Sequence, residues 1–320
     1  MSPVRPTSKR RSSTRTHTLS LPLKRPFELR LALFGHGFVD LAPHVWLPEA
    51  RRFETAFELS AAAVDLSLVQ RGHCLNVRLS SRRKLDAAEL SEARRAIERM
   101  LRLDEDFRPF WRLCRRVPRL GWAARRGAGR MLRSSTLFED LVKLLMTTNC
   151  SWAATRNMVS RLVASLGEAT PSGARTFPSA SRVAEQREAF FRDVVRAGYR
   201  AAHLRELARG FARGELVEKD LDDPELPADE VRRRLRALPG FGPYAAGQAM
   251  RLLGRYTDLA LDSWCISRLA ALRGRAPSER SLLREYRDFA GYAGLAFWLD
   301  LTAEWHGEGP ALGASPFVES

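Results

Sequence analysis

A short segment with two prolines and two glycines, residues 239–243, restricts the local fold of this chain more than any other. Residues 228–238 before it have apolar side chains at helical spacing with arginines between them, which predicts a basic amphipathic helix. Pro239 and Gly240 end that helix. Pro243 lies where a second helix begins, because proline is favoured at the first helical position. The sequence therefore predicts two helices joined by a tight hairpin.

This hairpin has the properties of a phosphate-binding site. Gly240 and Gly242 lack side chains, so the backbone between the helices can approach a ligand closely. The amides of Gly242, Tyr244 and Ala245 lack helical partners and carry the positive end of the helix dipole, which favours anions. An ordinary corner between two helices without a ligand is the alternative, and the hairpin alone leaves both interpretations open.

A carboxylate follows the second helix in an apolar setting. Asp262 comes directly after Leu259, Ala260 and Leu261 and precedes a further predicted helix that ends at Gly274. A carboxylate at a helix start is kept ionised by the dipole, and it can stabilise a positive charge that develops on a substrate. Capping the helix is the structural alternative, since aspartate is common in that position.

The Leu-Pro-Gly-Phe-Gly segment, the helix rich in small residues after it and Asp262 resemble one known motif. It is the helix-hairpin-helix motif, with its Gly/Pro-rich loop and catalytic aspartate, of DNA glycosylases of the base-excision superfamily. The resemblance covers residues 26–305 and is densest over 137–265. It implies a mostly α fold with a smaller α+β N-terminal domain, as in the 3-methyladenine DNA glycosylase II and 8-oxoguanine glycosylase branch. It also implies that Asp262 is catalytic and that DNA is bound by Pro239, Gly240, Phe241, Gly242 and Ala245.

The resemblance also implies a pocket for a base that has left the duplex, and such a pocket needs aromatic faces for stacking. The candidates for it are Tyr244, Trp264, Trp152 and Gln248. A polar turn between predicted helices 137–146 and 152–166 corresponds in type to the family motif that fills the gap left by the flipped base. That turn contains Thr147, Thr148 and Asn149, and a simple capped helix start is the alternative reading of it.

One position bears on the reaction type. Bifunctional relatives have a lysine two residues after the second hairpin glycine, and it attacks the sugar. Tyr244 occupies that position here, and no lysine follows Lys219. The resemblance therefore implies a monofunctional glycosylase without lyase activity that acts on an alkylated purine. An 8-oxoguanine-type glycosylase and a non-catalytic protein that binds duplex DNA through its hairpin are the alternatives.

The order of the predicted elements suggests four segments. Residues 1–25 are expected to form a disordered basic tail, and residues 26–104 an α+β domain. In that domain residues 27–34, 51–69 and 73–80 have strand patterns, and residues 87–103 have a helical one. Residues 105–136 are expected to form an extended basic connecting segment, and residues 137–320 the all-α glycosylase domain. His36, His44 and His73 are isolated and are expected at the surface or in hydrogen bonds, and the aromatic residues near Trp298 are expected in the core.

The charge of the chain points to a polyanionic partner. The formal net charge is +16, and it remains +9 without residues 1–25, so the folded part is itself basic. Residues 107–138 contain nine arginines and no acid, which is consistent either with a solvated surface or with one that faces DNA. Double-stranded DNA with a damaged base is the expected partner. No apolar run has the length of a membrane span, and a monomer is expected.

The four cysteines lie far apart at positions 74, 114, 150 and 265. Only Cys265 follows Asp262, which excludes the iron–sulfur cluster that some relatives bind after their aspartate, and no metal-binding spacing is present. No cofactor is expected. The sequence leaves open whether the hairpin binds a monovalent cation. Unpaired cysteines suit a reducing compartment, namely the bacterial cytoplasm with its nucleoid or a eukaryotic nucleus.

Overall fold

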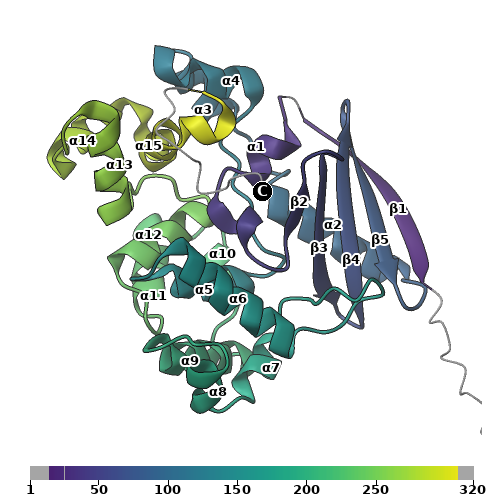
Figure 1. Ribbon diagram of the computed structural model, residues 1–320. Coiled ribbons are helices and arrows are strands. Elements are labelled where there is room, and N and C mark those ends of the chain that lie inside the picture. Colours follow the sequence, from purple (N-terminus) through teal and green to yellow (C-terminus); the bar gives the residue numbers. More distant parts are fainter. Residues whose placement is uncertain (1–13, 25, 309–320) are drawn as a thin grey trace, which may run out of the picture.

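The computed structural model describes residues 14–24 and 26–308 and shows an antiparallel sheet beside a larger helical body (Figure 1). The five strands are β1 (Arg15–Pro22), β2 (Val45–Leu47), β3 (Arg52–Leu59), β4 (Ala62–Arg71) and β5 (Cys74–Ser81). Their order in the sheet is β1-β5-β4-β3-β2, with every neighbouring pair antiparallel. Alternate side chains such as Leu66, Leu68, Val77 and Leu79 are buried, so one face of the sheet contributes to the core.

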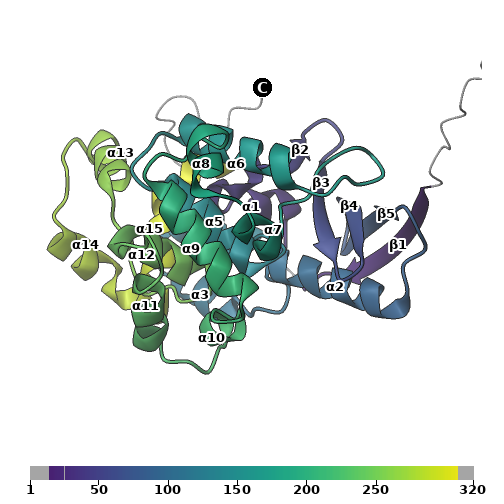
Figure 2. The ribbon, with the colours of Figure 1, turned by 90° about the horizontal axis from the view of Figure 1, so that it is seen from below.

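Helix α2 (Ala87–Leu101) lies across one face of the sheet (Figures 1 and 2). Asp86 caps its first turn by accepting a hydrogen bond from the Glu89 amide, and the Glu89 side chain accepts one from the Asp86 amide. Ala93, Ile97 and Leu101 are fully buried along its inner face. The helix predicted over residues 87–103 is therefore present and ends two residues earlier.

The helical body contains the remaining elements. They are α1 (Leu29–Leu33), η1 (Gly37–Asp40), α3 (Arg108–Cys114), η2 (Pro118–Leu120), α4 (Gly121–Arg126), α5 (Leu137–Thr147), α6 (Trp152–Leu166), α7 (Ala180–Ala184), α8 (Glu188–Asp193), α9 (Arg200–Ala212), α10 (Lys219–Asp222), α11 (Ala228–Arg236), α12 (Pro243–Leu252), α13 (Ser263–Arg273), α14 (Glu279–Tyr286), η3 (Arg287–Tyr292), α15 (Ala293–Leu301) and η4 (Ala303–His306). The predicted fold class, mostly α with a smaller α+β part, is confirmed.

Two predictions about the N-terminal region are wrong. Residues 15–22 were assigned to the disordered tail, but they form β1 and pair with β5 from Arg15 opposite Ser81 to Pro22 opposite Cys74. The composition of this segment, rich in Ser, Thr and Arg, predicted disorder. The pairing that makes it a strand is with β5, which lies far along the chain and which local composition does not report. Residues 1–13 lie outside the described residues. The strand expected within 27–34 is helix α1. This helix is buried on nearly every side, so the alternation of apolar and polar residues did not mark a buried and an exposed face of a strand.

The basic connecting segment is also different from its prediction. It is not extended but contains α3, η2 and α4, and several of its arginines have acidic partners from distant parts of the chain. Arg119 pairs with Glu285 and Asp300, Arg126 with Glu28 and Glu308, and Arg133 with Asp140 and Asp222. Arg130 is buried, 4.8 Å from the ring centre of Phe107. These four arginines make contacts that stabilise the fold, although Arg119 is itself partly exposed, and the other five are exposed at the surface: Arg108, Arg112, Arg115, Arg116 and Arg125.

The loop from Gly35 to Asp40 connects the N-terminal region to the helical body. The indole nitrogen of Trp298 in α15 donates to the Gly35 carbonyl at 2.8 Å, and that of Trp152 in α6 donates to the Asp40 carboxylate at 2.7 Å. The loop is thereby held beside both helices, which places it at the edge of the site described below. None of the helices in the described part of the chain is long and apolar enough to span a membrane.

Candidate active site and hairpin

The predicted hairpin is present between α11 and α12. Gly240 has a positive φ of 77°, in the left-handed region that favours glycine, and a Cβ there would lie 2.7 Å from Leu145 Cδ1. Gly242 is the N-cap of α12 with φ −82°, and a Cβ there would meet no atom within 4 Å. The two glycines therefore have different roles, since Gly240 is needed for the turn and Gly242 leaves the start of the helix open.

This difference predicts different effects of alanine at the two positions. Gly240→Ala should reduce the free energy of unfolding by about 1–3 kcal/mol, because it combines an unfavourable φ with a steric clash. Gly242→Ala should change it by less than about 0.5 kcal/mol. Urea unfolding of both variants measures these effects. Equal losses at the two positions would show that the hairpin conformation has been misinterpreted.

The DNA-binding residues predicted at the hairpin divide into exposed and buried ones. The side chains of Phe241 and Ala245 are buried, so these residues can present only their backbone amides. No side chain caps the start of α12. Pro239 is half-buried, and Arg236 is exposed just before the turn. The hairpin therefore offers backbone donors and one nearby cation.

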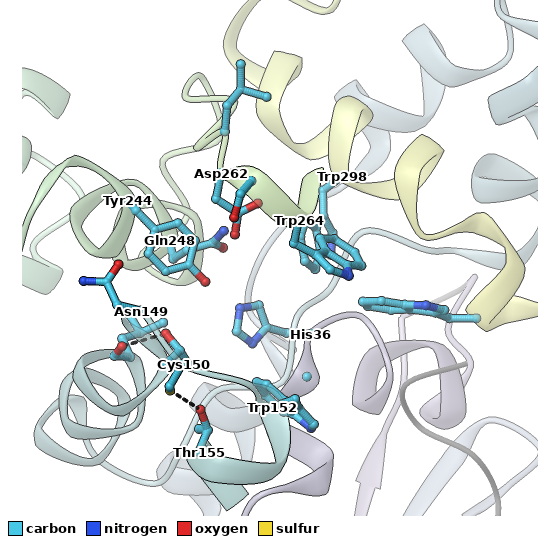
Figure 3. A pocket seen from close by; sticks show the side chains of 16 residues that line it. His36, Asn149, Cys150, Trp152, Thr155, Tyr244, Gln248, Asp262, Trp264 and Trp298 are labelled. Carbon is cyan, nitrogen blue, oxygen red and sulfur yellow. Dashed lines mark hydrogen bonds between the residues drawn. The ribbon is translucent and has the colours of Figure 1, made fainter. Parts of the chain in front are cut away.

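A cavity of about 570 Å³ lies next to the hairpin helix (Figure 3). Its lining includes the predicted residues Tyr244 and Gln248 from α12, Trp264 from α13, Trp152 from α6, and Asp262. Figure 3 shows Tyr244 and Gln248 on one side, Trp264 and Trp298 on the other, and His36 between them. The structure thus brings together five residues that the sequence places up to about 110 positions apart.

Asp262 is the N-cap of α13, as its sequence context predicted, and its Oδ1 accepts a hydrogen bond from the Cys265 amide at 2.7 Å. The carboxylate is half-buried and faces the cavity. Burial, together with the negative charge of Asp262, raises the pKa of Tyr244 to about 12 and that of the Cys265 thiol to about 12. Both groups therefore remain protonated at neutral pH, and among the described residues that line the cavity Asp262 is the one with a carboxyl group.

Of the three residues in the polar turn at 147–149 that were predicted to contact DNA, only one is fully exposed. Thr147 is half-buried and donates to the Leu144 carbonyl at 2.7 Å, and Thr148 is buried and donates to the Leu145 carbonyl at 2.8 Å. Asn149 is exposed with a positive φ of 46°, a conformation that asparagine tolerates, and donates to Tyr199 at 3.1 Å. Asn149 is thus the residue of the three that extends furthest into solvent.

Sequence reasoning missed several residues of the cavity. His36 was expected at the surface or in a hydrogen bond; it is buried beside Gln248, with which it interacts, and it also lines the cavity, where burial and the nearby Arg251 lower its pKa to about 3. Trp298 was expected in the core, yet it also lines the cavity. The other missed residues are Gly37, Leu144, Cys150, Thr155, Leu261, Ser263 and Trp305. Gly35, next to His36, was a local signal of close packing, since a Cβ there would clash with the Arg130 carbonyl oxygen.

Comparisons with solved structures identify the fold. A 3-methyladenine DNA glycosylase from Archaeoglobus fulgidus matches with a TM-score of 0.70 and 18% identity, over 90% of this chain and 99% of that chain. The apo form of an 8-oxoguanine glycosylase/lyase from Clostridium acetobutylicum matches with a TM-score of 0.69 and 17% identity, over 90% and 97%. The same enzyme with double-stranded DNA containing cytosine opposite 8-oxoguanine matches with a TM-score of 0.65 and 17% identity, over 88% and 93%.

Neither the protein-family models nor the curated proteins that were compared with this sequence match it. The structural likeness nevertheless extends over about nine tenths of the chain. It includes the small antiparallel sheet as well as the helical body with its hairpin. This chain therefore has the fold of helix-hairpin-helix DNA glycosylases, in the form shared by the 3-methyladenine and 8-oxoguanine enzymes.

Proposed function

We propose that this protein is a monofunctional DNA glycosylase that hydrolyses the N-glycosidic bond of an alkylated purine flipped out of duplex DNA. The observation that carries the proposal is the position of Asp262. Its carboxylate faces a cavity with walls made of Tyr244, Trp264, Trp298 and Trp152, and it follows a hairpin with open amides. An aromatic cavity of this kind accepts a planar base, which stacking on the rings stabilises.

The reaction follows from this arrangement. When the bond between the sugar and the base breaks, both bonding electrons leave with the base and the sugar becomes positively charged. Asp262 lies where its carboxylate can stabilise that charge and orient a water molecule. The water oxygen then bonds to the anomeric carbon and gives up a proton, which passes to an anionic departed base or, where the base leaves neutral, to solvent, so the products are a free base and an abasic site.

Binding of DNA is assigned to the surface around the cavity. The amides at the start of α12 and the exposed Arg236 are suited to a phosphate, because both favour negative charge. The exposed Asn149 is assigned to the minor groove, where it takes the place of the flipped base. The likeness of the fold to a glycosylase with bound double-stranded DNA supports this assignment.

A panel of lesions tests the proposed activity. Duplexes that each contain one alkylated purine, one 8-oxoguanine or only normal bases are incubated with the protein, and released bases and alkali-labile sites are measured. Release of an alkylated purine is the expected result. Preferential release of 8-oxoguanine would show that the assigned substrate is wrong. Binding without any release would favour a non-catalytic protein that binds duplex DNA.

The absence of a lyase step gives a separate prediction. Among the described residues that line the cavity there is no lysine, so borohydride should trap no covalent complex between the protein and DNA. Tyr244→Lys is the matched variant, since it places an amine at the position where bifunctional relatives have one, and it should give a trapped complex. A covalent complex with the parent protein would contradict the hydrolytic mechanism.

A further inference from the structure

A buried cation lies behind the wall of the cavity. Arg251 is in α12, one helical turn after Gln248, and only 1% of its surface is exposed. One guanidinium nitrogen donates to Gln248 Oε1 at 3.0 Å, and another donates to the Leu259 carbonyl at 2.9 Å. Both of these hydrogen-bond partners are neutral. Removing a charge from water is costly, so an arginine in this position suggests a role beyond packing.

Arg251 determines the orientation of the Gln248 amide. A guanidinium can only donate hydrogen bonds, so the amide oxygen of Gln248 must face Arg251. The amide NH₂ group therefore faces away from Arg251, on a side chain that lines the cavity. The guanidinium also polarises the amide and makes it a stronger donor. Gln248 thus presents a hydrogen-bond donor to whatever base occupies the cavity.

The same cation changes the character of an aromatic wall. The guanidinium carbon of Arg251 lies 4.7 Å from the ring centre of Trp298, which also lines the cavity. An aromatic ring attracts a cation through its electron density, and here that attraction is already used by Arg251. A second cation in the cavity would be repelled by the first. This wall therefore favours a base without formal positive charge.

The charge state of the groups around Gln248 bears on what the cavity can bind. His36 interacts with Gln248, but burial and Arg251 keep its pKa at about 3, so the ring is neutral and supplies no charge at physiological pH. Tyr244 stays protonated as well. Asp262 caps α13 and is assigned to the sugar by the proposed mechanism, and its charge, like that of Asp258, also attracts the Arg251 guanidinium. Among the polar side chains that line the cavity, Gln248 is the one whose orientation is fixed by the buried Arg251 guanidinium.

We propose that Gln248, held by Arg251, binds an acceptor atom of a neutral damaged purine and stabilises the negative charge that this base acquires as it leaves. The inference rests on the proposed glycosylase activity and specifies its substrate class. As the bond to the sugar breaks, its electron pair passes to the purine, and the charge spreads to a ring nitrogen or carbonyl oxygen. The Gln248 N–H stabilises that atom, water supplies hydroxide to the sugar, and the remaining proton finally neutralises the base.

A cationic purine, such as one methylated at N7, leaves as a neutral molecule and gains nothing from this donor. Gln248 is thus assigned to substrate selection, and Arg251 is a positioning residue that acts through it. The substrates expected to react faster are neutral damaged purines with an acceptor edge, for example ethenoadenine. Cationic 7-methylguanine is expected to react more slowly once its spontaneous release has been subtracted.

Gln248→Glu provides the test, because it retains an oxygen for Arg251, keeps the volume and replaces the donor with a negative charge. The ratio of the release rates of ethenoadenine and 7-methylguanine should fall at least about tenfold relative to the parent. Gln248→Met is the second variant, since it removes the donor without adding charge. It should slow the release of ethenoadenine more than that of 7-methylguanine, so the ratio of the two rates falls here as well. Thermal unfolding of both variants verifies that they fold.

The inference is overturned if both variants fold and the ratio stays within twofold of the parent value. Failure of the proposed function has a different signature, because the parent would then release neither base. In that case the same two duplexes are compared by their dissociation constants, with and without Gln248→Glu, in the Asp262→Asn background. A preference for the ethenoadenine duplex that is lost with glutamate supports the inference, and equal affinities throughout overturn it.

Discussion

Asp262→Asn is expected to reduce base release by at least about a hundredfold and to leave the affinity for duplex DNA within about twofold, because the variant removes the anion that stabilises the charged sugar. The substitution keeps the shape of the side chain. Asparagine is as good a helix N-cap as aspartate, so the hydrogen bond from the Cys265 amide should persist. Single-turnover release of a base and a DNA-binding titration measure the two effects.

Asp86→Asn is the matched control for this experiment. Asp86 caps α2 with a hydrogen bond of 2.8 Å from the Glu89 amide, the same duty that Asp262 performs for α13, but it lies outside the cavity. If capping were the whole role of Asp262, the two asparagine variants would behave alike. Unreduced release by Asp262→Asn would therefore contradict the proposed mechanism, whatever the result for DNA binding.

Lys143→Met is expected to lower the free energy of unfolding by about 3–5 kcal/mol, since it leaves a buried carboxylate without its partner. Lys143 is fully buried and lies 2.6 Å from Glu139 within α5. Its ammonium group is also 3.2 Å from His44, whose other ring nitrogen lies 2.9 Å from Thr55 in β3. This chain of contacts joins the helical body to the sheet, so its loss should weaken the junction between them.

The effect of Lys143→Met should depend on pH. Burial raises the pKa of Glu139, and the ammonium group of Lys143 opposes that rise, so the variant should raise this pKa further. The folded state then holds a proton that the unfolded state has lost. The stability of the variant should consequently fall as the pH rises above the ordinary pKa of glutamate toward the raised one. Urea unfolding at pH 5 and pH 8 measures this, and the loss should be larger at pH 8.

A surface pair with the same helical spacing serves as the control. Arg94 and Glu98 in α2 lie 2.9 Å apart, with 55% and 35% of their side chains exposed. Arg94→Met should cost less than about 1 kcal/mol, because solvent screens the pair. If Lys143→Met were no more destabilising than Arg94→Met, the buried pair would not stabilise the junction.

Local sequence signals were sufficient where the structure depends on the backbone of a few neighbouring residues. Pro243 begins α12 and Asp262 stands at the start of α13, as their contexts predicted. Each of these features is decided within one helical turn, so neighbouring residues contain the necessary information. The hairpin and its downstream carboxylate could therefore be located without coordinates.

The arginines show where such reasoning fails. Residues 107–138 contain no acid, which suggested a surface for DNA. Yet Arg126 binds Glu28 and Arg119 binds Asp300, partners about 100 and 180 residues away. A charge is neutralised by whatever lies near it in space, and separation along the chain does not report that distance. The same reason explains why strand β1 was assigned to a tail.

The sequence by itself determined the hairpin, the position of Asp262 at a helix start, and Tyr244 in place of a lysine. Only the tertiary structure decided what surrounds them. It brought His36 from the N-terminal region and Trp298 from α15 to the cavity, and it placed the Arg251 guanidinium against Gln248 and Trp298. Backbone turns are set by adjacent residues. The polarity of a cavity depends instead on side chains that meet only when distant segments pack together.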